Sequence, residues 1–456
     1  MLNSFQEEQN QVLKLILNER FFQVWKNKEL YIDNELEKDY SLWNNSGLEL
    51  YLTNKCTQQC KYCYLVKHPE LYPAGIDNSQ ILNNLHLIYQ WILDNDFHIP
   101  WIELFSGEIW HLEFGIEVLN ITLEYIKKGM KVDNFIIPTN GQFLYDTAQT
   151  ILIQQLIIEF LQNGSKITIS FSCDGKIVDS DNRLRPQEYT DDFYNKLCFF
   201  AKINNFFIQS MLTPNTVSQW KENYLWWEKQ CAEFDMSVES TVKILEERNN
   251  DWDDESVHAL NDFLDFRIRN YIDKYCNGDI ELFTRQLFNL DNEISPWNDY
   301  LMFELNNDNN TPACTISQAL FIRVGDLSII PCHRLAYDRY LYGKLVVNDN
   351  KIVDITENNL GVAIRILAQS NIMGSMKCDI CKYKDYCIKG CFGQQYEEKK
   401  DPFLPVNGVC NLMSGKYSFL ISLYKELGVF EYLKQYRYLP RINKLFDFAK
   451  EIGNAI

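Results

Sequence analysis

Apolar and polar positions follow two alternating rhythms from Gly47 onward. Short runs rich in β-branched and aromatic residues, typical of strands, are separated by longer stretches whose apolar residues recur at helical spacing. The predicted strands lie at 48–53, 101–106, 135–139, 167–172, 206–212 and 236–242. Strands that alternate with helices favour a parallel sheet, so the pattern predicts an α/β protein with six βα units.

Two of the intervening helices are well marked by their apolar faces. The helix after the sixth strand is predicted to begin at Asp253, Asp254 and Glu255, because acidic residues suit a helix N-terminus. Its apolar face holds Val257, Leu260, Leu264, Ile268 and Tyr271, and the helix after the first strand has Ile81, Leu82, Leu85, Ile88, Tyr89, Ile92 and Leu93.

Two of the predicted strands have one apolar and one polar face. In 167–172 and 236–242, apolar residues alternate with Ser, Thr or Glu. A parallel sheet buried on both sides is normally apolar throughout, so the polar face predicts either a lumen that holds a polar ligand or an exposed sheet face. Glu103 and Glu239 are expected to point into such a lumen, where each carboxylate either binds substrate, takes a proton or forms an ion pair.

Composition narrows the class of protein. The 456 residues include 44 Lys and Arg against 62 Asp and Glu, a net charge of −18, which argues against a nucleic-acid partner. No run approaches the roughly 18 apolar residues of a membrane-spanning helix, and the first ten residues have neither a basic nor an apolar segment of a signal peptide. We therefore expect a cytoplasmic protein with no membrane partner.

Fourteen cysteines are unusual for a reducing compartment, where clustered thiols indicate metal or redox chemistry. Cys56, Cys60 and Cys63 form one group, and seven more lie between 314 and 410. The other four, which we interpret as buried small hydrophobic residues, are Cys173, Cys198, Cys231 and Cys276.

The first cysteine group follows directly on the first predicted strand. In barrel enzymes the carboxyl end of a strand faces the active site. Three thiolates suit a [4Fe-4S] cluster with one open iron, whereas a closed zinc site needs a distant fourth ligand. The spacing CxxxCxxC, with Tyr62 before the last cysteine, resembles the signature of radical S-adenosylmethionine enzymes.

The resemblance extends over residues 48 to about 242 and implies a partial (β/α)6 TIM-like barrel that binds S-adenosylmethionine. Ser106, Gly107 and Glu108 look like the family's GGE motif, which holds the methionine amino group. Ser172, in SFSCDGK, is similar to the serine that reaches the cofactor, and Arg183 stands where relatives have an arginine near the methionine carboxylate. Asn140-Gly141 after Thr139 resembles a common family turn, although a plain turn and a surface role for Arg183 are the alternatives.

The second cysteine group, with the spacing CxxCx5CxxxC from Cys378, resembles the SPASM extension of the same enzymes. That extension implies two auxiliary [4Fe-4S] clusters, and hence three clusters in all; a pair of zinc sites is the alternative. When the ligand pattern of the SPASM family is carried over to this sequence, it implies that one cluster is held by Cys314, Cys332 and Cys391. The other is then held by Cys378, Cys381, Cys387 and Cys410. Relatives usually place a glycine five residues before the second cysteine, whereas Gly325 lies seven before Cys332, so we expect a two-residue insertion there.

Three functions are compatible with these motifs. The first is a peptide maturase that abstracts hydrogen from a residue of a ribosomally made precursor and forms a thioether or C–C crosslink. The second is an anaerobic sulfatase-maturating enzyme, disfavoured because His333 stands where that family has an aspartate base after the second SPASM cysteine. The third is a non-catalytic cluster scaffold. An enzyme of either kind implies a flavodoxin or ferredoxin as electron donor, and a maturase also implies a precursor peptide and a possible separate leader-binding protein.

The predicted organisation has five parts. An N-terminal extension (1–46) precedes the radical S-adenosylmethionine barrel (47–245) and a helical bridging region (246–310). The SPASM domain (311–413) and C-terminal helices (414–456) follow.

Overall fold

The computed structural model describes residues 47–72, 77–110, 114–184, 191–290, 319–341, 343–357, 378, 380–383, 387, 391–400 and 404–453. The predicted N-terminal extension, 1–46, and Cys314 lie outside these residues. Within them, no helix is long and apolar enough to cross a membrane.

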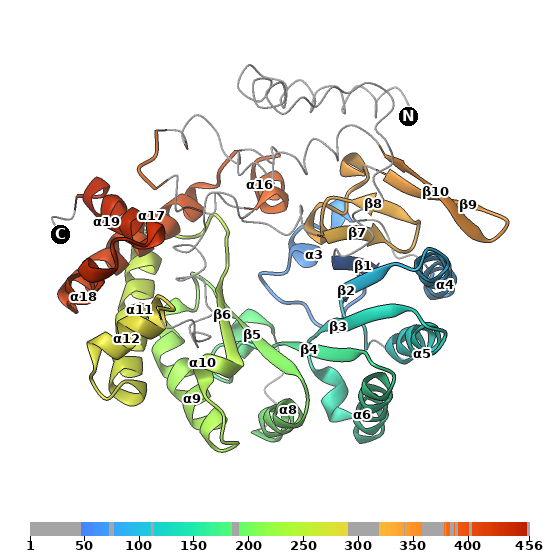
Figure 1. The fold of residues 1–456 in the computed structure, drawn as a ribbon, viewed down its shortest axis with the longest axis horizontal. Helices are drawn as coiled ribbons and strands as arrows, with labels where there is room; N and C mark the ends of the chain where they lie inside the picture. The colour runs from blue at the N-terminus through green and yellow to red at the C-terminus, as the bar shows by residue number, and fades with distance from the viewer. Residues whose placement is uncertain are drawn as a thin grey trace.

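Six parallel strands form the centre of the molecule (Figure 1). They are β1 (Gly47–Thr53), β2 (His98–Ser106), β3 (Lys131–Thr139), β4 (Lys166–Ser172), β5 (Phe206–Leu212) and β6 (Val242–Glu246). They pair in chain order, and helices follow them on the outside of the curved sheet. These helices are α4 (Asn78–Asp94), α5 (Phe114–Lys127), α6 (Thr147–Gln162), α8 (Asp191–Ile203), α9 (Trp220–Ala232) and α11 (Asp254–Tyr275). The predicted α/β partial barrel is confirmed.

Alternate residues of the strands face either an apolar layer beneath the outer helices or the inner wall of the barrel. On β1 and β2, Leu50 and Leu104 pack under the helices, while the register partners Glu49 and Glu103 lie on the opposite face. On β4, Ile169 belongs to the same core as Leu50. The inner face of the sheet lines a cavity, as the alternation predicted.

The sixth strand was predicted at 236–242, and this is wrong. The strand is β6 at Val242–Glu246, and the residues before it form the short helix α10 (Val238–Thr241). Glu239 on α10 is buried and accepts hydrogen bonds from Tyr224 and Arg267, so it does not reach the lumen. A short alternating pattern suits one helical turn as well as a strand, and packing against α11 decides between them.

Beyond α11 and α12 (Ile280–Leu287), the sheet continues with segments from the cysteine-rich region. β7 (Ala319–Arg323) pairs parallel with β1, and β8 (Ser328–Ile330), β9 (Gly343–Asn348) and β10 (Lys351–Glu357) extend the sheet antiparallel. The described sheet has ten strands in the order β10-β9-β8-β7-β1-β2-β3-β4-β5-β6. The cysteine-rich region is therefore joined to the barrel by backbone pairing.

The loop between β7 and β8 is held against the barrel by α4. Asn84 donates hydrogen bonds to the carbonyls of Val324 and Gly325 at 2.8 and 3.0 Å. Leu327, five residues before Cys332, has a φ of 60°, in the left-handed region that favours glycine. Leucine thus occupies a left-handed turn conformation that glycine adopts more easily.

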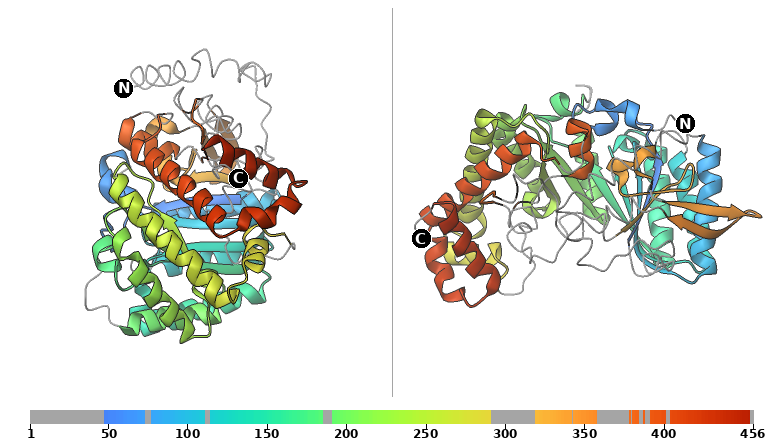
Figure 2. Two further views of the ribbon diagram at one scale, coloured as in Figure 1. Left: turned by 90° about the vertical axis from the view of Figure 1, so that its left-hand side faces the viewer. Right: turned by 90° about the horizontal axis from the view of Figure 1, so that it is seen from above.

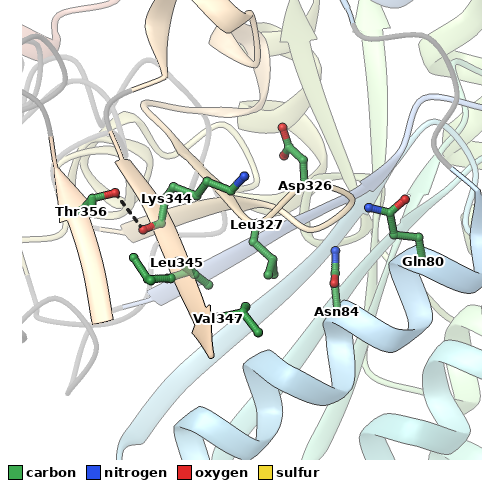
Figure 3. A pocket seen from close by; sticks show the side chains of 9 residues that line it. Gln80, Asn84, Asp326, Leu327, Lys344, Leu345, Val347 and Thr356 are labelled. Atoms are coloured by element: carbon green, nitrogen blue, oxygen red, sulfur yellow. Dashed lines mark hydrogen bonds between the residues drawn. The ribbon is translucent and has the colours of Figure 1, made fainter. Parts of the chain in front are cut away.

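A cavity of about 470 Å³ lies between α4 on one side and the β7–β8 loop and β9 on the other (Figure 3). Its wall includes Gln80, Asn84, Leu327 and Lys344, and no cysteine. Asp326, also on the wall, is hydrogen-bonded to Arg323. We interpret this cavity as a gap in packing between α4 and the strands β9 and β10.

The C-terminal residues form helices that pack on the end of the barrel (Figure 2). These helices are α16 (Phe392–Lys399), α17 (Asn407–Glu426), α18 (Val429–Leu433) and α19 (Pro440–Glu451). α17 lies along α11, and the buried Lys416 on α17 reaches Glu246 at the end of β6. The last helices, α18 and α19, contribute buried apolar residues such as Phe430 and Phe446 to the core.

Candidate functional site

The loop after β1 brings three thiols to the mouth of the barrel. Cys56, Cys60 and Cys63 all line a cavity of about 740 Å³ at the carboxyl ends of the strands. The loop is short and internally bonded: the Gln58 N–H donates to the Cys56 sulfur at 3.4 Å, and the Cys63 N–H donates to the Cys60 carbonyl at 3.0 Å. The predicted first cysteine group is therefore one structural unit that faces the cavity.

These thiols are in an environment that disfavours a bare thiolate. Burial raises the pKa of Cys56 to about 11 and that of Cys60 to about 12. The pKa of Cys63 is also raised by burial, opposed by the backbone N–H groups of Leu65 and Val66. A cationic metal centre that binds the sulfurs removes this penalty, because it stabilises the deprotonated form. The donor set thus fits an iron–sulfur cluster.

The segment after β2 packs directly on the cysteine loop. The Gly107 N–H donates to the Thr53 carbonyl at 2.7 Å, and the Glu108 N–H donates to the Lys55 carbonyl at 2.9 Å. A Cβ on Gly107 would lie 2.4 Å from the Lys55 carbonyl oxygen, so glycine is required by the close approach of two backbones. Gly107 lines the cavity beside the thiols.

Glu108 is held in place by a network of hydrogen bonds. Its buried carboxylate accepts hydrogen bonds from the Asn140 N–H at 2.6 Å, the Thr139 hydroxyl at 2.9 Å and the Trp110 N–H at 3.1 Å. It is absent from the described wall of the large cavity. In this structure Glu108 ties the loop after β2 to the loop after β3, and through Asn140, which donates to Thr57, to the cysteine loop.

Arg183 is also on the cavity wall, but it is not a surface residue. Its exposed fraction is 6%, and its guanidinium donates to Asp174 at 3.0 Å and lies 5.3 Å from the centre of the Tyr62 ring. The fully buried Asp174 also accepts from the Met211 N–H at 2.8 Å. Tyr62, Ser172 and Arg183 therefore line the same cavity as the three thiols, with Asp174 holding Arg183 in place.

A second group of ionisable side chains lies further along the inner wall. Glu49 and Glu103 are direct neighbours on β1 and β2, and His333 Nδ1 lies 2.8 Å from Glu49 Oε1. The His333 ring stacks on Phe105, with ring centres 4.2 Å apart. Burial, and then the charge of Glu49, raise the pKa of Glu103 to about 8. The carboxylate of Glu49, and after it that of Glu103, raise the pKa of His333 against the opposing effect of burial.

The second cysteine group lines a separate cavity of about 280 Å³. Cys378, Cys381, Cys387 and Cys410, the predicted ligands of one cluster, are all on its wall. Cys410 lies in the first turn of α17, where the helix dipole favours a thiolate. The fold therefore gathers four thiols that are up to 32 residues apart in the chain.

Cys391 lies between the two cavities. It lines the smaller cavity with those four cysteines and the larger cavity with Cys332. The resemblance pairs Cys391 with Cys332 and Cys314, but Cys314 is outside the described residues. Among the described residues, no three His, Cys, Asp or Glu side chains are grouped to hold a single metal ion. Thiols spread around a cavity suit a multi-iron cluster better than one tetrahedral zinc ion.

Comparison with solved structures identifies the fold. "Native anSMEcpe with bound AdoMet and Cp18Cys peptide" matches with a TM-score of 0.53 and 16% identity, over 88% of this chain and 99% of that chain. "Native anSMEcpe with bound AdoMet" matches with a TM-score of 0.52 and 16% identity, over 88% and 99%. These proteins are anaerobic sulfatase-maturating enzymes of the radical S-adenosylmethionine/SPASM class. The chain has the radical S-adenosylmethionine/SPASM fold. No family model and no curated protein sequence matches it.

The radical S-adenosylmethionine/SPASM fold brings together most of the residues predicted from the sequence. The large cavity has on its wall Cys56, Cys60, Tyr62, Cys63, Gly107, Ser172, Arg183, Cys332 and Cys391. Thr139, Asn140 and His333, also singled out from the sequence, are on the same wall. Ser106 ends β2 beside Gly107.

Sequence reasoning missed several residues of this site. Glu246 and Gln394 carried no signal of their own, because polar residues at element ends are common. Asp174 is the aspartate of the motif-like segment SFSCDGK, but its pairing with Arg183 was not foreseen. Glu49 is the exception: it occupies the polar phase of the first predicted strand and could have been found by the alternation that identified Glu103.

Proposed function

We propose that this protein is a radical S-adenosylmethionine enzyme that abstracts a hydrogen atom from a residue of a ribosomally made peptide and forms a thioether or C–C crosslink. The observation that carries the proposal is the gathering of these residues around one large cavity. Three thiols, the glycine-bearing loop after β2, and Ser172 and Arg183 all line it, and Cys332 and Cys391 line it too.

Each part of the wall has a role in this proposal. Cys56, Cys60 and Cys63 hold a [4Fe-4S] cluster, and Gly107, Ser172, Arg183 and Tyr62 surround the bound S-adenosylmethionine. S-Adenosylmethionine reduced at such a cluster supplies a carbon-centred radical that removes hydrogen from a nearby C–H bond. The chain keeps that bond close and excludes water by enclosing the peptide residue in the barrel.

The second cysteine group is assigned to two auxiliary [4Fe-4S] clusters. Cys378, Cys381, Cys387 and Cys410 hold one, and Cys314, Cys332 and Cys391 hold the other. Forming a crosslink after hydrogen abstraction leaves one electron to remove, and a cluster held by Cys332 and Cys391, which line the cavity, would supply an electron acceptor there. An external flavodoxin or ferredoxin supplies the reducing electron in the cytoplasm, and a separate leader-binding protein assists peptide capture.

A sulfatase-maturating activity is the second candidate, because the matched structures are of anSMEcpe with bound AdoMet and, in one, a Cp18Cys peptide. His333, paired with Glu49, stands at the position of that family's aspartate base. Formation of formylglycine in a cysteine-containing sulfatase peptide would favour this candidate over the crosslinking maturase.

Cleavage of S-adenosylmethionine tests the proposed chemistry. Anaerobically reconstituted and reduced protein should release 5′-deoxyadenosine, and Cys60→Ala should abolish the release because the cluster loses a ligand. Cys198→Ala is the matched control, since Cys198 is also buried but lies in the outer core. Equal release by the Cys60 variant and the parent would refute the assigned cluster.

A further inference from the structure

Three side chains on the wall of the large cavity have no role in the cluster and S-adenosylmethionine sites proposed above. They are Glu103 on β2, Glu246 at the end of β6 and Gln394 on α16, which also lines the smaller cavity. These residues come from three elements far apart in the chain. What they share is an acceptor oxygen without a partner among the described residues.

Glu103 faces the cavity from the polar side of β2. Its neighbour Glu49 lies 2.8 Å from His333 Nδ1, but no described residue forms a hydrogen bond or ion pair with Glu103. Two carboxylates directly opposite on adjacent strands repel each other. A donor from outside the protein would therefore stabilise this pair.

Glu246 and Gln394 add buried acceptors. The Glu246 side chain is 10% exposed; its Oε1 accepts from Lys416 at 3.3 Å, while its buried Oε2 has no partner among the described residues. Gln394 is 2% exposed, and its Oε1 is likewise unpartnered. A buried acceptor without a hydrogen bond is costly, so both oxygens are suited to receive donors from a bound ligand.

The arginines on the wall are engaged elsewhere, whereas His333, which pairs with Glu49, also acts electrostatically on Glu103. Arg183 is paired with Asp174, Arg334 is paired with Glu397, and Arg248 is engaged in another contact within the protein. Glu247, the remaining acid on the wall, is paired with Lys67 at 2.9 Å. Because the chain carries a net charge of −18, its electrostatic field favours a cationic ligand.

We propose that the large cavity binds a lysine or arginine side chain of the peptide substrate at Glu103, while Glu246 Oε2 and Gln394 Oε1 accept hydrogen bonds from N–H groups elsewhere along the same peptide. The inference rests on the proposed function and deepens it, because it specifies a basic residue in the substrate. The aliphatic stem of that residue packs along Phe105 and Met211, which also line the cavity.

A pair of synthetic peptides tests this inference directly. The two are identical except for one central residue, lysine in one and norleucine in the other, which has the same stem without the charge. Binding of each fluorescently labelled peptide to the anaerobically reconstituted protein is measured by anisotropy, with S-adenosylmethionine present. Measurements in about 0.5 M salt screen the general attraction of a basic peptide to an acidic protein.

We expect the lysine peptide to bind the parent protein at least about tenfold more tightly than the norleucine peptide at high salt, as a charge-assisted hydrogen bond implies. Glu103→Gln should remove this difference, whereas Glu246→Gln should weaken both peptides alike. Glu222→Gln, on the exposed side of α9, is the matched control and should keep the full preference. Iron content and circular dichroism verify that each variant is folded.

Equal affinity of the two peptides for the parent protein at high salt would overturn the inference, and this result depends on no variant. An unchanged lysine preference in folded Glu103→Gln would overturn the role of Glu103. Both results are separate from failure of the proposed function, which appears as absence of 5′-deoxyadenosine from the parent protein.

Discussion

Single residues at the barrel mouth are constrained by backbone contacts as much as by chemistry. Gly107 sits where two loops touch, and Glu108 bonds to the loop after β3 instead of lining the cavity. Glu108 therefore holds the loops after β2 and β3 together. Glu103, by contrast, faces the cavity with its carboxyl group available.

Gly107→Ala should damage the site through geometry alone. The new Cβ would lie 2.4 Å from the Lys55 carbonyl oxygen, so the cysteine loop has to move. We expect a loss of about 1–3 kcal/mol in the free energy of unfolding and weaker S-adenosylmethionine binding. Denaturant titration and equilibrium binding measure the two effects, and unchanged values for both would contradict the close approach.

The raised pKa of Glu103, about 8, makes stability depend on pH. The folded protein holds this proton more tightly than the unfolded chain, so the contribution is complete below about pH 4.5 and is lost as the pH rises to about 8. Glu103→Gln has no such loss. Between about pH 5 and 8, the free energy of unfolding of this variant should therefore rise relative to that of the parent by about 1 kcal/mol or more.

Denaturant titrations of both proteins at several pH values check this prediction. His333, whose pKa is also raised, remains in both proteins, and Glu222→Gln serves as a control that should follow the parent. A constant difference between Glu103→Gln and the parent across this range would mean that Glu103 is ionised in the folded protein.

At the scale of elements, α10 and α11 are joined by a buried ion pair. Arg267 on α11 donates to Glu239 on α10, and both side chains are at most 5% exposed. Tyr224 on α9 donates to the same carboxylate at 2.6 Å. This network holds three helices together and explains why Glu239 is part of the packing and not of the lumen.

Removing one partner of this pair should be strongly destabilising. We expect Arg267→Leu to lower the free energy of unfolding by about 3–5 kcal/mol, because it leaves Glu239 buried without its cation. Adding Glu239→Gln should recover part of the loss. Chemical denaturation of the two single variants and the double variant gives the coupling energy, and purely additive effects would contradict a direct interaction.

At the scale of the whole molecule, the sheet and the cysteine groups connect barrel and extension. β7 pairs with β1, the strand that leads into the first cysteine loop, and Cys391 borders both cavities. The two cysteine groups are thus parts of one continuous framework. Cys332 and Cys391 share the larger cavity with the first group, whereas Cys378, Cys381, Cys387 and Cys410 line the smaller one.

The ten clustered cysteines predict the iron content. If they hold three [4Fe-4S] clusters, reconstituted protein should contain about twelve irons per chain, three times four, with little zinc. Replacing Cys56, Cys60 and Cys63 together should remove about a third. Stoichiometric zinc with almost no iron would contradict cluster chemistry.

Separate cavities predict separable losses of function. Cys387→Ala or Cys410→Ala removes a thiol from the smaller cavity, so release of 5′-deoxyadenosine should persist while peptide modification, followed by mass, fails. A thermal-unfolding control is needed, because a cluster also stabilises the segment that holds it. Full modification by a folded variant that lacks this cluster would refute its role.

The sequence alone determined the βα order, five of the six strands, the helix that begins at Asp253, and the two cysteine groups. These features are local, because alternation, helical spacing and short cysteine spacings depend only on residues that are close together in the chain. The capping box at Asp253, where the side chain accepts from the Ser256 N–H, is local in the same way.

Only the tertiary structure decided the partners of the buried charges. Glu239 meets Arg267 across 28 residues, His333 meets Glu49 across 284, and Asn140 and Glu108 join two loops after different strands. The pairing of β7 with β1 likewise depends on which strand edge is free after the barrel has formed. Burial and long-range proximity set these contacts, and neither is encoded in any short stretch of the chain.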